Sequence, residues 1–330
     1  MVTGGAGYIG SQTVKELKDG GYNPIVFDNL STGHEEAIKG VELVKGDLSK
    51  FEEISRALKD YQPDAVVHFA ASIEVEESVK DPEKYFQNNI VNGLNLLRAM
   101  KENNIKKIIF SSSAAVYGDT EINPISENDP KKPMNPYGLT KMMFEKILES
   151  YAPAYGLKSI SLRYFNAAGA DPSGQMGQDK EKPSHLITRV LWTALGKYPK
   201  VEVYGTDYDT PDGTCLRDYI HIKDLAAAHV LALKALETGQ FSPAYNLGTG
   251  KGYSVKEVIE MAKKVSGKDF VVENMPRRAG DPRELIASSA LARQELGFEP
   301  KFSDLETIIQ SAWNWHKNHP EGYGESSKSK

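Results

Sequence analysis

Two side chains that can exchange protons with a substrate lie four residues apart near the middle of the chain. Tyr137 and Lys141 belong to the run Asn-Pro-Tyr-Gly-Leu-Thr-Lys, and residues at this spacing share one face of a helix. An ammonium group favours the phenolate form of a nearby tyrosine, so it lowers the pKa of the hydroxyl. We therefore expect Tyr137 to act as a base near neutral pH, assisted by Lys141.

The start of the chain supplies a partner for that chemistry. Gly4, Gly7 and Gly10 have the spacing G-x-x-G-x-x-G, with Tyr8 and Ile9 between the last two. A glycine-rich turn lets the backbone approach a pyrophosphate, and the helix that follows offers its N-terminal N–H groups. A cluster of glycines is also compatible with an ordinary tight turn. Together with a proton-transferring tyrosine, it predicts a nicotinamide dinucleotide that takes part in hydride transfer.

Asp28 indicates the kind of dinucleotide. It ends a predicted strand about twenty residues after the glycines, where a carboxylate accepts a hydrogen bond from a ribose 2′-hydroxyl. The same charge would repel a 2′-phosphate, which favours NAD over NADP. Asp47 follows the next strand and is either an adenine contact or an ordinary loop residue. The other candidates for contacts with the cofactor are Asn29, Leu48, Phe69, Ala70, Ala71, Asn88 (equally compatible with a helix surface), Ser111 and Tyr164.

The first half of the chain alternates short apolar runs with helical patterns. This alternation predicts an α/β fold, a Rossmann-type doubly wound parallel sheet with helices on both faces. Asn135 is a good N-cap and Pro136 suits the first helical position, so the dipole of the helix that carries Tyr137 also favours a phenolate. The predicted strands are Pro24–Phe27, Val41–Lys45, Ala65–Phe69, Lys107–Ser111 and Ser159–Arg163, and the predicted helices are Gly10–Asp19, Phe51–Asp60, Pro82–Asn103 and Pro136–Tyr155.

The chain changes character near residue 170. We expect residues 1–170 to form an NAD-binding Rossmann domain and residues 171–330 a smaller substrate-binding region, interleaved with the last strands of the sheet. Residues 171–183 and 204–213 are predicted loops, and residues 325–330 a disordered tail. Ser254 with Glu257 and Ser303 with Glu306 are predicted capping boxes. The predicted helices of this half are Ser184–Gly196, Asp224–Thr238, Ser254–Ser266 and Ser303–Asn318.

Composition and charge limit the classes of partner. The chain has 330 residues, 40% of them hydrophobic, and a formal net charge of -5. This charge argues against nucleic acid or an anionic membrane as the main partner, and no apolar run approaches the ~20 residues of a membrane span. No signal peptide is apparent. A single cysteine, Cys215, excludes a disulfide within the chain and suits a reducing cytoplasm. The histidines show no metal-ligand spacing, so we expect no metal site.

Several motifs, in order along nearly the whole chain, resemble a known family. Residues 4–10, the serines at 111–113, Tyr137 with Lys141, and the run Arg-Tyr-Phe-Asn at 163–166 are similar to extended short-chain dehydrogenases/reductases. The run Asp-Gly-Thr-Cys-Leu-Arg-Asp-Tyr-Ile-His at 212–221, with Tyr-Asn-Leu-Gly at 245–248 and Arg-Arg-Ala-Gly-Asp at 277–281, narrows the resemblance to the UDP-glucose 4-epimerases. The Tyr-Lys pair marks the superfamily only, whereas residues 212–221 are far more specific.

The resemblance implies reversible 4-epimerisation of UDP-glucose and UDP-galactose. In that family a tightly held NAD takes a hydride from C4 of the hexose, a 4-keto intermediate turns in the pocket, and the hydride returns to its other face. Tyr137 would be the general base and then the general acid, Lys141 would lower its pKa and hold the nicotinamide ribose, and Ser113 would hydrogen-bond the reacting oxygen. The implied substrate contacts, besides Ser113 and Tyr137, are Asn166, His185, Leu186, Val203, Tyr204, Arg217, Tyr219, Arg278, Asp281 and Leu285.

Three features depart from the family pattern. The first strand has only about two or three residues where about five are usual, which places stability and cofactor retention in question. Ile73 replaces a lysine that several epimerases have near the cofactor, and His185 replaces a common asparagine of the sugar pocket. Leu285 lies where some epimerases have a tyrosine that excludes N-acetylated sugars. Because leucine is smaller than tyrosine, we predict some activity on UDP-N-acetylhexosamines.

Other functions compete with this interpretation. A 4,6-dehydratase needs an extra acid and base just after the serine of the fifth strand, but Ser113 is followed by Ala114 and Ala115. A 4-epimerase of a UDP-pentose or of UDP-glucuronate stays open, because such specificity depends on pocket contacts. A non-catalytic NAD-binding protein also stays open, since fold alone does not settle function.

The resemblance also implies a homodimer that pairs through two helices of the first half, 82–103 and 136–155. The first helix has an apolar stripe of Ile90, Leu94 and Leu97, and the second one of Met142, Met143 and Ile147. The alternative is that these residues pack only on the sheet of their own chain.

Overall fold

The computed structural model describes residues 1–180, 183–239, 241–278 and 281–324, so the predicted disordered tail lies outside the described residues. The main layer is a seven-stranded sheet in the order β10-β6-β5-β4-β1-β2-β3, and every strand pair in it is parallel. All the strands that the sequence predicts are present, with small differences at their ends. The bounds are β1 Val2–Thr3, β2 Ile25–Asp28, β3 Glu42–Lys45, β4 Val66–His68, β5 Lys107–Ser113, β6 Lys158–Tyr164 and β10 Ala244–Leu247.

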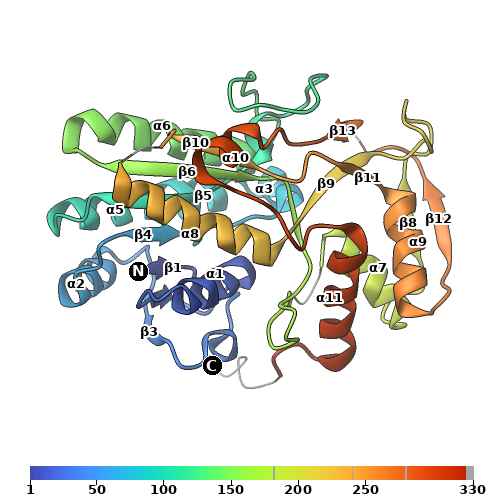
Figure 1. Ribbon diagram of the computed structural model, residues 1–330, viewed down its shortest axis with the longest axis horizontal. Coiled ribbons are helices and arrows are strands. Elements are labelled where there is room, and N and C mark those ends of the chain that lie inside the picture. Colours follow the sequence, from blue (N-terminus) through green and yellow to red (C-terminus); the bar gives the residue numbers. More distant parts are fainter. Residues whose placement is uncertain (181–182, 240, 279–280, 325–330) are drawn as a thin grey trace.

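Helices cover both faces of this sheet, which confirms the predicted doubly wound α/β fold (Figure 1). The helices α1 (Tyr8–Asp19), α8 (Ile222–Thr238) and α10 (Ala290–Leu296) pack on one face, and α2 (Phe51–Tyr61), α5 (Asn92–Glu102) and α6 (Pro136–Tyr155) on the other. The strands are buried on both sides and are therefore rich in aliphatic residues. Residues from the second half of the chain, in α8, β10 and α10, complete this layer.

The strand order contains a switch point next to the first strand. The chain places β2 and β3 on one side of β1, then returns to place β4, β5 and β6 on the other side. Ligands of such sheets bind at the carboxyl ends of the strands where the order reverses. The loop after β1 and the loop after β4 therefore meet at the edge where a dinucleotide is expected. With only two residues, β1 is as short as the sequence indicated.

The predicted helix 82–103 is interrupted. It consists of α4 (Pro82–Phe86), a π-helical turn (Gln87–Val91) and α5, after a short α3 (Val75–Lys80) that the sequence pattern missed. A π turn shifts the phase of the residues after it, so the predicted stripe is partly wrong. Ile90 and Leu97 are buried in the core of their own chain, whereas Leu94 is 36% exposed and lies near Val91, which is 44% exposed.

The rest of the chain forms a smaller region beside the sheet, at the right of Figure 1. Its core lies between α7 (Leu186–Ala194), α9 (Val255–Ser266) and α11 (Leu305–Asn318). In this region β8 (Val201–Tyr204) pairs with β12 (Val272–Met275). A second set of strands surrounds β9 (Leu216–His221), which pairs with β7 (Asn166–Ala168), β11 (Gly252–Ser254) and β13 (Glu284–Leu285).

Only one of the two predicted capping boxes forms. The Ser254 side chain accepts a hydrogen bond from the Glu257 N–H, and the Glu257 carboxylate accepts one from the Ser254 N–H, so α9 begins as predicted. The box at Ser303 is wrong, because Asp304 caps α11 instead. The Ser303 hydroxyl is used elsewhere, donating to the Asp224 carboxylate and accepting from the His221 N–H at 2.9 Å.

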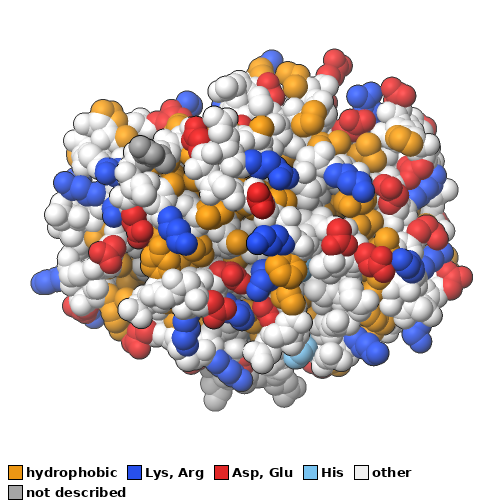
Figure 2. Space-filling model, in the orientation of Figure 1, with side chains coloured by type: hydrophobic (Ala, Val, Ile, Leu, Met, Phe, Trp, Pro, Cys, Tyr) orange, Lys and Arg blue, Asp and Glu red, His pale blue; other side chains and the backbone are white. Residues whose placement is uncertain are grey.

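The surface in Figure 2 mixes Lys and Arg side chains with Asp and Glu side chains rather than separating them. Such a mixture gives no extended field of one sign on that face. Among the described residues, no helix is both long enough and apolar enough to cross a membrane. The same residues contain no group of three or more His, Cys, Asp or Glu side chains arranged to hold a metal ion, and Cys215 is buried.

Candidate active site

The glycine turn lies directly against the loop after β4. Gly4 has a φ of +71°, and a Cβ on it would lie 2.5 Å from the backbone N of Ala70. A Cβ on Gly10 would lie 2.3 Å from the Gly4 carbonyl oxygen. Gly7 is the N-cap of α1 and has no side chain with which to satisfy the first N–H groups of that helix. The N–H groups at Tyr8 and Ile9 are thus directed toward the switch point, where they can bind a phosphate.

Asp28 lies where the sequence placed it, at the end of β2 beside the glycine turn. Its two carboxylate oxygens accept hydrogen bonds from Ala6 N at 2.9 Å and Leu30 N at 2.8 Å. Each carboxylate oxygen keeps a second lone pair for a hydroxyl. Burial raises the pKa of Asp28, and the two backbone hydrogen bonds oppose that rise. Asn29 donates from Nδ2 to Asp47 Oδ2 at 2.9 Å, which brings two further predicted residues to the same edge.

The loop after β4 forms the opposite side of the crevice. The N–H groups of Phe69 and Ala70 donate to the Thr3 carbonyl at 2.9 and 3.1 Å, and Ala71 follows them. Asn88 donates from Nδ2 to the Ser72 hydroxyl at 3.1 Å. Leu48 differs from the other candidates, because its side chain packs in the hydrophobic core between the sheet and α2.

The sequence reasoning missed Asn89, which ties the two halves of this crevice together. Its side-chain oxygen accepts from Ser72 N at 2.8 Å, and its Nδ2 donates to Thr140 Oγ1 at 3.0 Å. Thr140 is the residue before Lys141 on α6. The sequence could not separate Asn88 from Asn89, because the π turn that contains both shifts the phase of the helix.

The catalytic candidates meet where β5 ends and α6 begins. Asn135 caps α6, with its side chain accepting from Gly138 N at 2.9 Å, as predicted. The Ser113 side chain lies close enough to Tyr137 to lower the pKa of its hydroxyl. Lys141 donates from Nζ to the Ser111 carbonyl at 2.7 Å and lies 5.8 Å from the centre of the Tyr137 ring.

The expected lowering of the Tyr137 pKa is wrong, because this pKa is raised. Burial raises the pKa of Tyr137, the hydrogen bond from Ser113 opposes this rise, and the charge of Glu74 adds to it. Lys141 is itself desolvated, which lowers its pKa to about 7, against an opposing effect of Glu145. Residue spacing revealed the pair but not its burial, and desolvation disfavours the charged form of both groups.

Tyr164 lies at the end of β6, opposite Ser113 in the register of β5 and β6. Its hydroxyl lies 3.2 Å from His229 Nε2. Burial raises the pKa of Tyr164, as it does that of Tyr137. Tyr164 lies at the end of the strand next to Ser113 and stays a predicted contact of the cofactor.

Glu74 is a second residue that the sequence reasoning missed. It caps α3 just after the loop that follows β4, and its carboxylate accepts hydrogen bonds from the Ser184 hydroxyl at 2.7 Å and from Lys180. His185, the N-cap of α7, lies next to this contact, with Nδ1 2.8 Å from Gln178 Nε2. The position of Glu74 after a β-strand was the only available signal, since its partners are more than a hundred residues away.

The remaining substrate candidates gather around β8 and β9. Asn166 lies opposite Tyr219 in the pairing of β7 with β9, and its Nδ2 donates to the Asp218 carbonyl at 3.0 Å. Val203 and Tyr204 end β8, and the Arg278 guanidinium lies 3.7 Å from the centre of the Tyr204 ring.

Arg217 and Leu285 pair in the register of β9 and β13. Arg217 donates from Nη2 to Asp281 Oδ1 at 3.0 Å, so these two candidates contact each other. Leu285 packs against the small apolar cluster that includes Ala114 and Val116, directly after Ser113. The structure thus extends the site from Ser113 along β13 and β9 toward Arg217.

Leu186 is the first residue of α7. Residues 279–280 of the Arg-Arg-Ala-Gly-Asp motif lie outside the described residues.

Comparison with known proteins identifies the family. Residues 1–248 match the family model described as the NAD dependent epimerase/dehydratase family. The chain is 50% identical to the UDP-glucose 4-epimerase of Halalkalibacterium halodurans, over 100% of this chain and 99% of that protein.

Two solved structures are also similar over nearly the whole chain. A UDP-glucose 4-epimerase from Brucella ovis in complex with NAD has a TM-score of 0.93 and 48% identity, covering 94% of this chain and 96% of that one. A UDP-Glc/GlcNAc 4-epimerase from Campylobacter jejuni has a TM-score of 0.85 and 44% identity, covering 96% and 98%. The chain therefore belongs to the NAD dependent epimerase/dehydratase family.

Proposed function

We propose that the protein catalyses the NAD-dependent, reversible 4-epimerisation of UDP-glucose and UDP-galactose. One observation carries the proposal: Ser113 ends β5 and Tyr137 and Lys141 begin α6, with Lys141 bound to the Ser111 carbonyl, at the same sheet edge as the glycine turn. An acid–base group next to a dinucleotide site is what a reversible oxidation at a sugar carbon requires. The similarity to UDP-glucose 4-epimerases supports a UDP-hexose as the substrate.

The described residues fit NAD. A side chain at Gly4 would collide with the backbone at Ala70, so this turn is kept open for a close approach. The uncapped start of α1 suits a pyrophosphate, and Asp28 keeps lone pairs free for ribose hydroxyls. When bound, the nicotinamide would supply hydride-transfer chemistry at a sugar carbon. We propose that residues 1–170 hold the cofactor and residues 171–330 mainly the substrate.

Side chains of the protein transfer the proton of the C4 hydroxyl. We propose that Tyr137 takes the proton of the C4 hydroxyl and later returns it, while Ser113 donates a hydrogen bond to the same oxygen. Lys141 holds the cofactor ribose and stabilises the phenolate of Tyr137. Because burial raises the Tyr137 pKa, the phenolate needs positive charge nearby, which protonated Lys141 provides.

We propose that the UDP group binds to the substrate candidates around β8 and β9. Arg217 and Arg278 suit a diphosphate, since a planar guanidinium matches phosphate geometry. The ring of Tyr204 suits stacking on a uracil, and its present contact with Arg278 shows that one ring face accepts a planar group. Asp281 would accept from the uridine ribose. Asn166, His185, Leu186, Val203 and Tyr219 complete the proposed pocket.

Leu285 supports a wider sugar range. It is half-buried and packs beside Ala114 and Val116, which places its short apolar side chain near the reacting end of the site. We propose that UDP-N-acetylhexosamines are also accepted, as the name of the Campylobacter jejuni relative says of that protein. Leu285→Tyr should lower kcat/KM for UDP-N-acetylglucosamine about tenfold or more and leave UDP-glucose nearly unchanged, because only the N-acetyl group needs the extra volume. A wild-type protein inactive on UDP-N-acetylglucosamine would contradict this.

We further propose a cytoplasmic homodimer. Val91 at the end of the π turn and Leu94 on α5 are exposed, and Met143 and Ile147 on α6 are only half-buried. Such partly exposed apolar residues on two adjacent helices suit packing against a second copy. Sedimentation of the wild type and of Leu94→Glu would test this, with a monomeric wild type as the contradicting result. The single buried cysteine suits a reducing compartment.

The main test uses purified protein, UDP-galactose and no added NAD, with the anomeric proton of the sugar followed by NMR. Formation of UDP-glucose would support both the reaction and a retained cofactor. Tyr137→Phe, which keeps the ring and loses the hydroxyl, should reduce kcat by at least about a hundredfold. Absence of conversion by the wild type after NAD is supplied would refute the proposed function.

A further inference from the structure

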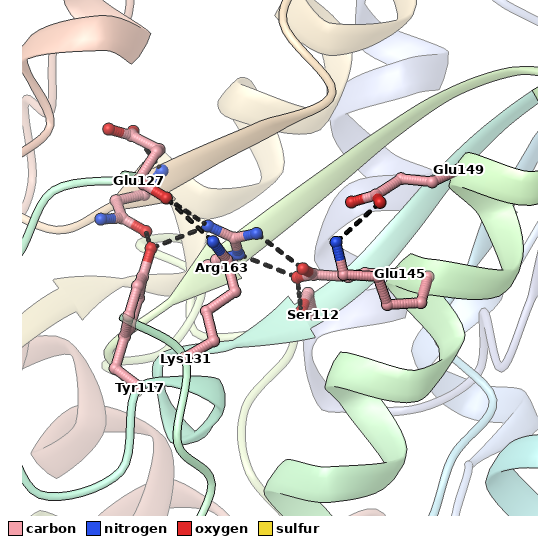
Figure 3. Close-up of polar contacts among 9 residues, drawn as sticks. Ser112, Tyr117, Glu127, Lys131, Glu145, Glu149 and Arg163 are labelled. Atoms are coloured by element: carbon pink, nitrogen blue, oxygen red, sulfur yellow. Dashed lines mark hydrogen bonds and ion pairs between the residues drawn. The ribbon is translucent and has the colours of Figure 1, made fainter. Parts of the chain in front are cut away.

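A buried ionic network joins α6 to β5 and β6 (Figure 3). Glu145 is four residues after Lys141 on the same helix, and its side chain is 5% exposed. Arg163, on β6, is 4% exposed and reaches Glu145 with two parallel bonds: Nε to Oε1 at 2.8 Å and Nη2 to Oε2 at 2.6 Å. This bidentate geometry is the strongest form of a guanidinium–carboxylate contact.

The network also includes the strand that carries Ser113. Ser112 donates from Oγ to Glu145 Oε1 at 2.6 Å, and it lies opposite Arg163 in the register of β5 and β6. Ser111 and Ser113, on either side of it, both contact the catalytic candidates. Ser112 therefore joins β5 to α6 between Ser111, whose backbone carbonyl binds Lys141, and Ser113 at the end of the strand.

The outer end of Arg163 holds the loop that leads into α6. Its Nη1 donates to the Tyr117 hydroxyl at 2.8 Å and to the Glu127 carbonyl at 3.3 Å. Tyr117 in turn donates to Asn246 Oδ1 on β10 at 2.7 Å. Glu145 and Arg163 thus connect α6 to β5, to β6, to the segment before Asn135, and through Tyr117 to β10.

We propose that Glu145 and Arg163 are positioning residues of the reaction: their ion pair fixes α6 on β5 and β6 and thereby sets the placement of Tyr137 and Lys141 relative to Ser113. This inference rests on the proposed function. The reason is geometric. Tyr137 and Ser113 come from different elements, and Tyr137 and Lys141 come from the same helix as Glu145. A small shift of α6 along the strands would separate the two hydroxyl groups without touching either.

A purely structural role predicts a different outcome from a positioning role. If the pair only stabilises the fold, variants that still fold should turn over at the wild-type rate. If it positions α6, folded variants should lose kcat with little change in KM, because substrate binding uses residues on β8 and β9. Replacing Glu145 or Arg163 alone would leave the other as an unpaired buried charge, and this could prevent folding. The test therefore uses variants that leave no unpaired charge.

Three variants carry the test. Ser112→Ala removes one hydrogen bond to Glu145 without changing the charge, and the double variant Glu145→Gln with Arg163→Met removes both charges together. A cavity of about 210 Å³ borders the pair, so water can enter beside the replaced side chains. Ser161→Ala is the matched control: Ser161 is on β6, two residues before Arg163, and is equally buried at 3% exposure.

For each variant we would measure kcat and KM for UDP-galactose, thermal unfolding, and hydrogen–deuterium exchange of the N–H groups at 137–141 in the unloaded protein. We expect kcat to fall about fivefold in Ser112→Ala and about a hundredfold in the double variant, with KM within about twofold, faster exchange at 137–141, and no change in Ser161→Ala. A folded double variant with wild-type kcat would overturn the proposal, as would a rise in KM alone. An inactive wild type would instead refute the proposed function, while the exchange measurement would still test the positioning of α6.

Discussion

Lys141 and Arg163 are both buried cations near α6, but their surroundings differ. Arg163 is bound by Glu145 through two parallel hydrogen bonds and also donates to Tyr117, and these contacts outweigh desolvation and raise its pKa. Lys141 donates to a single backbone carbonyl, that of Ser111, and its desolvation lowers its pKa to about 7. The first cation is held in one charge state, whereas the second can change its state near neutral pH.

This difference separates a structural cation from a functional one. A buried charge that is fully paired costs little in the folded protein, and breaking the pair costs much. A buried charge that is under-paired lowers stability, and such groups are retained where chemistry needs an adjustable proton. Substitution by methionine is therefore expected to lower the stability of the protein at Arg163 and to raise it at Lys141.

The largest effect on stability is expected from Arg163→Met. The substitution leaves Glu145 as a buried carboxylate without its cation, so the free energy of unfolding should fall by about 3–5 kcal/mol. Urea unfolding followed by circular dichroism would measure the change. The matched control is Arg98→Met, which removes a 58% exposed member of the pair with Glu102 and should cost about 0–1 kcal/mol. If the two substitutions lowered the free energy of unfolding equally, the buried pair would be no more important for stability than the exposed pair.

Lys141→Met should stabilise the protein without NAD while reducing kcat. We expect kcat to fall about a hundredfold, because protonated Lys141 no longer supports the phenolate of Tyr137. We expect the free energy of unfolding at pH 7 to rise by about 2 kcal/mol, since a desolvated amine is removed. Lys80→Met, at a side chain that is 72% exposed, is the control and should change neither quantity much.

The pH dependence of that gain follows from the two pKa values of Lys141. The folded-state pKa of about 7 is below the ordinary value of 10.5, so between these values the unfolded chain binds the proton and the folded protein does not. The cost of burying Lys141 is therefore full below about pH 7 and disappears above about 10.5. The advantage of Lys141→Met should shrink as pH rises through this window. A gain that grows with pH would contradict the assignment.

The smallest effect is expected from Glu74→Gln, which probes the charge around Tyr137 from the other side. The Glu74 carboxylate raises the pKa of Tyr137, so its removal should move the acid limb of the kcat profile to lower pH by about half a unit. Glu76→Gln is the control, because Glu76 is also on α3 but its side chain is 84% exposed and pairs with Lys80. A shift in the opposite direction would show that the Lys180 contact, and not the charge of Glu74, dominates.

The sequence predicted more of the sheet than of the connections between its elements. The strands β2 to β6 and most helices were recognised, because apolar periodicity and the caps at Asn135 and Ser254 are local signals. The capping box at Ser303 failed because its hydroxyl serves Asp224 and His221, which are about eighty residues away. The stripe of the helix 82–103 was partly right: Ile90 and Leu97 are buried in the core of their own chain, whereas Leu94 is 36% exposed.

For the candidate site, the sequence alone determined which chemical groups are present and in what order. The glycine turn, Asp28, and the spacing of Tyr137 and Lys141 are local patterns with direct chemical meaning. Only the tertiary structure decided the protonation tendencies of Tyr137 and Lys141, because burial depends on every element packed around them. It also decided the partners of Glu74, since hydrogen bonds between distant segments follow from the packing of the whole fold and leave no local pattern in the sequence.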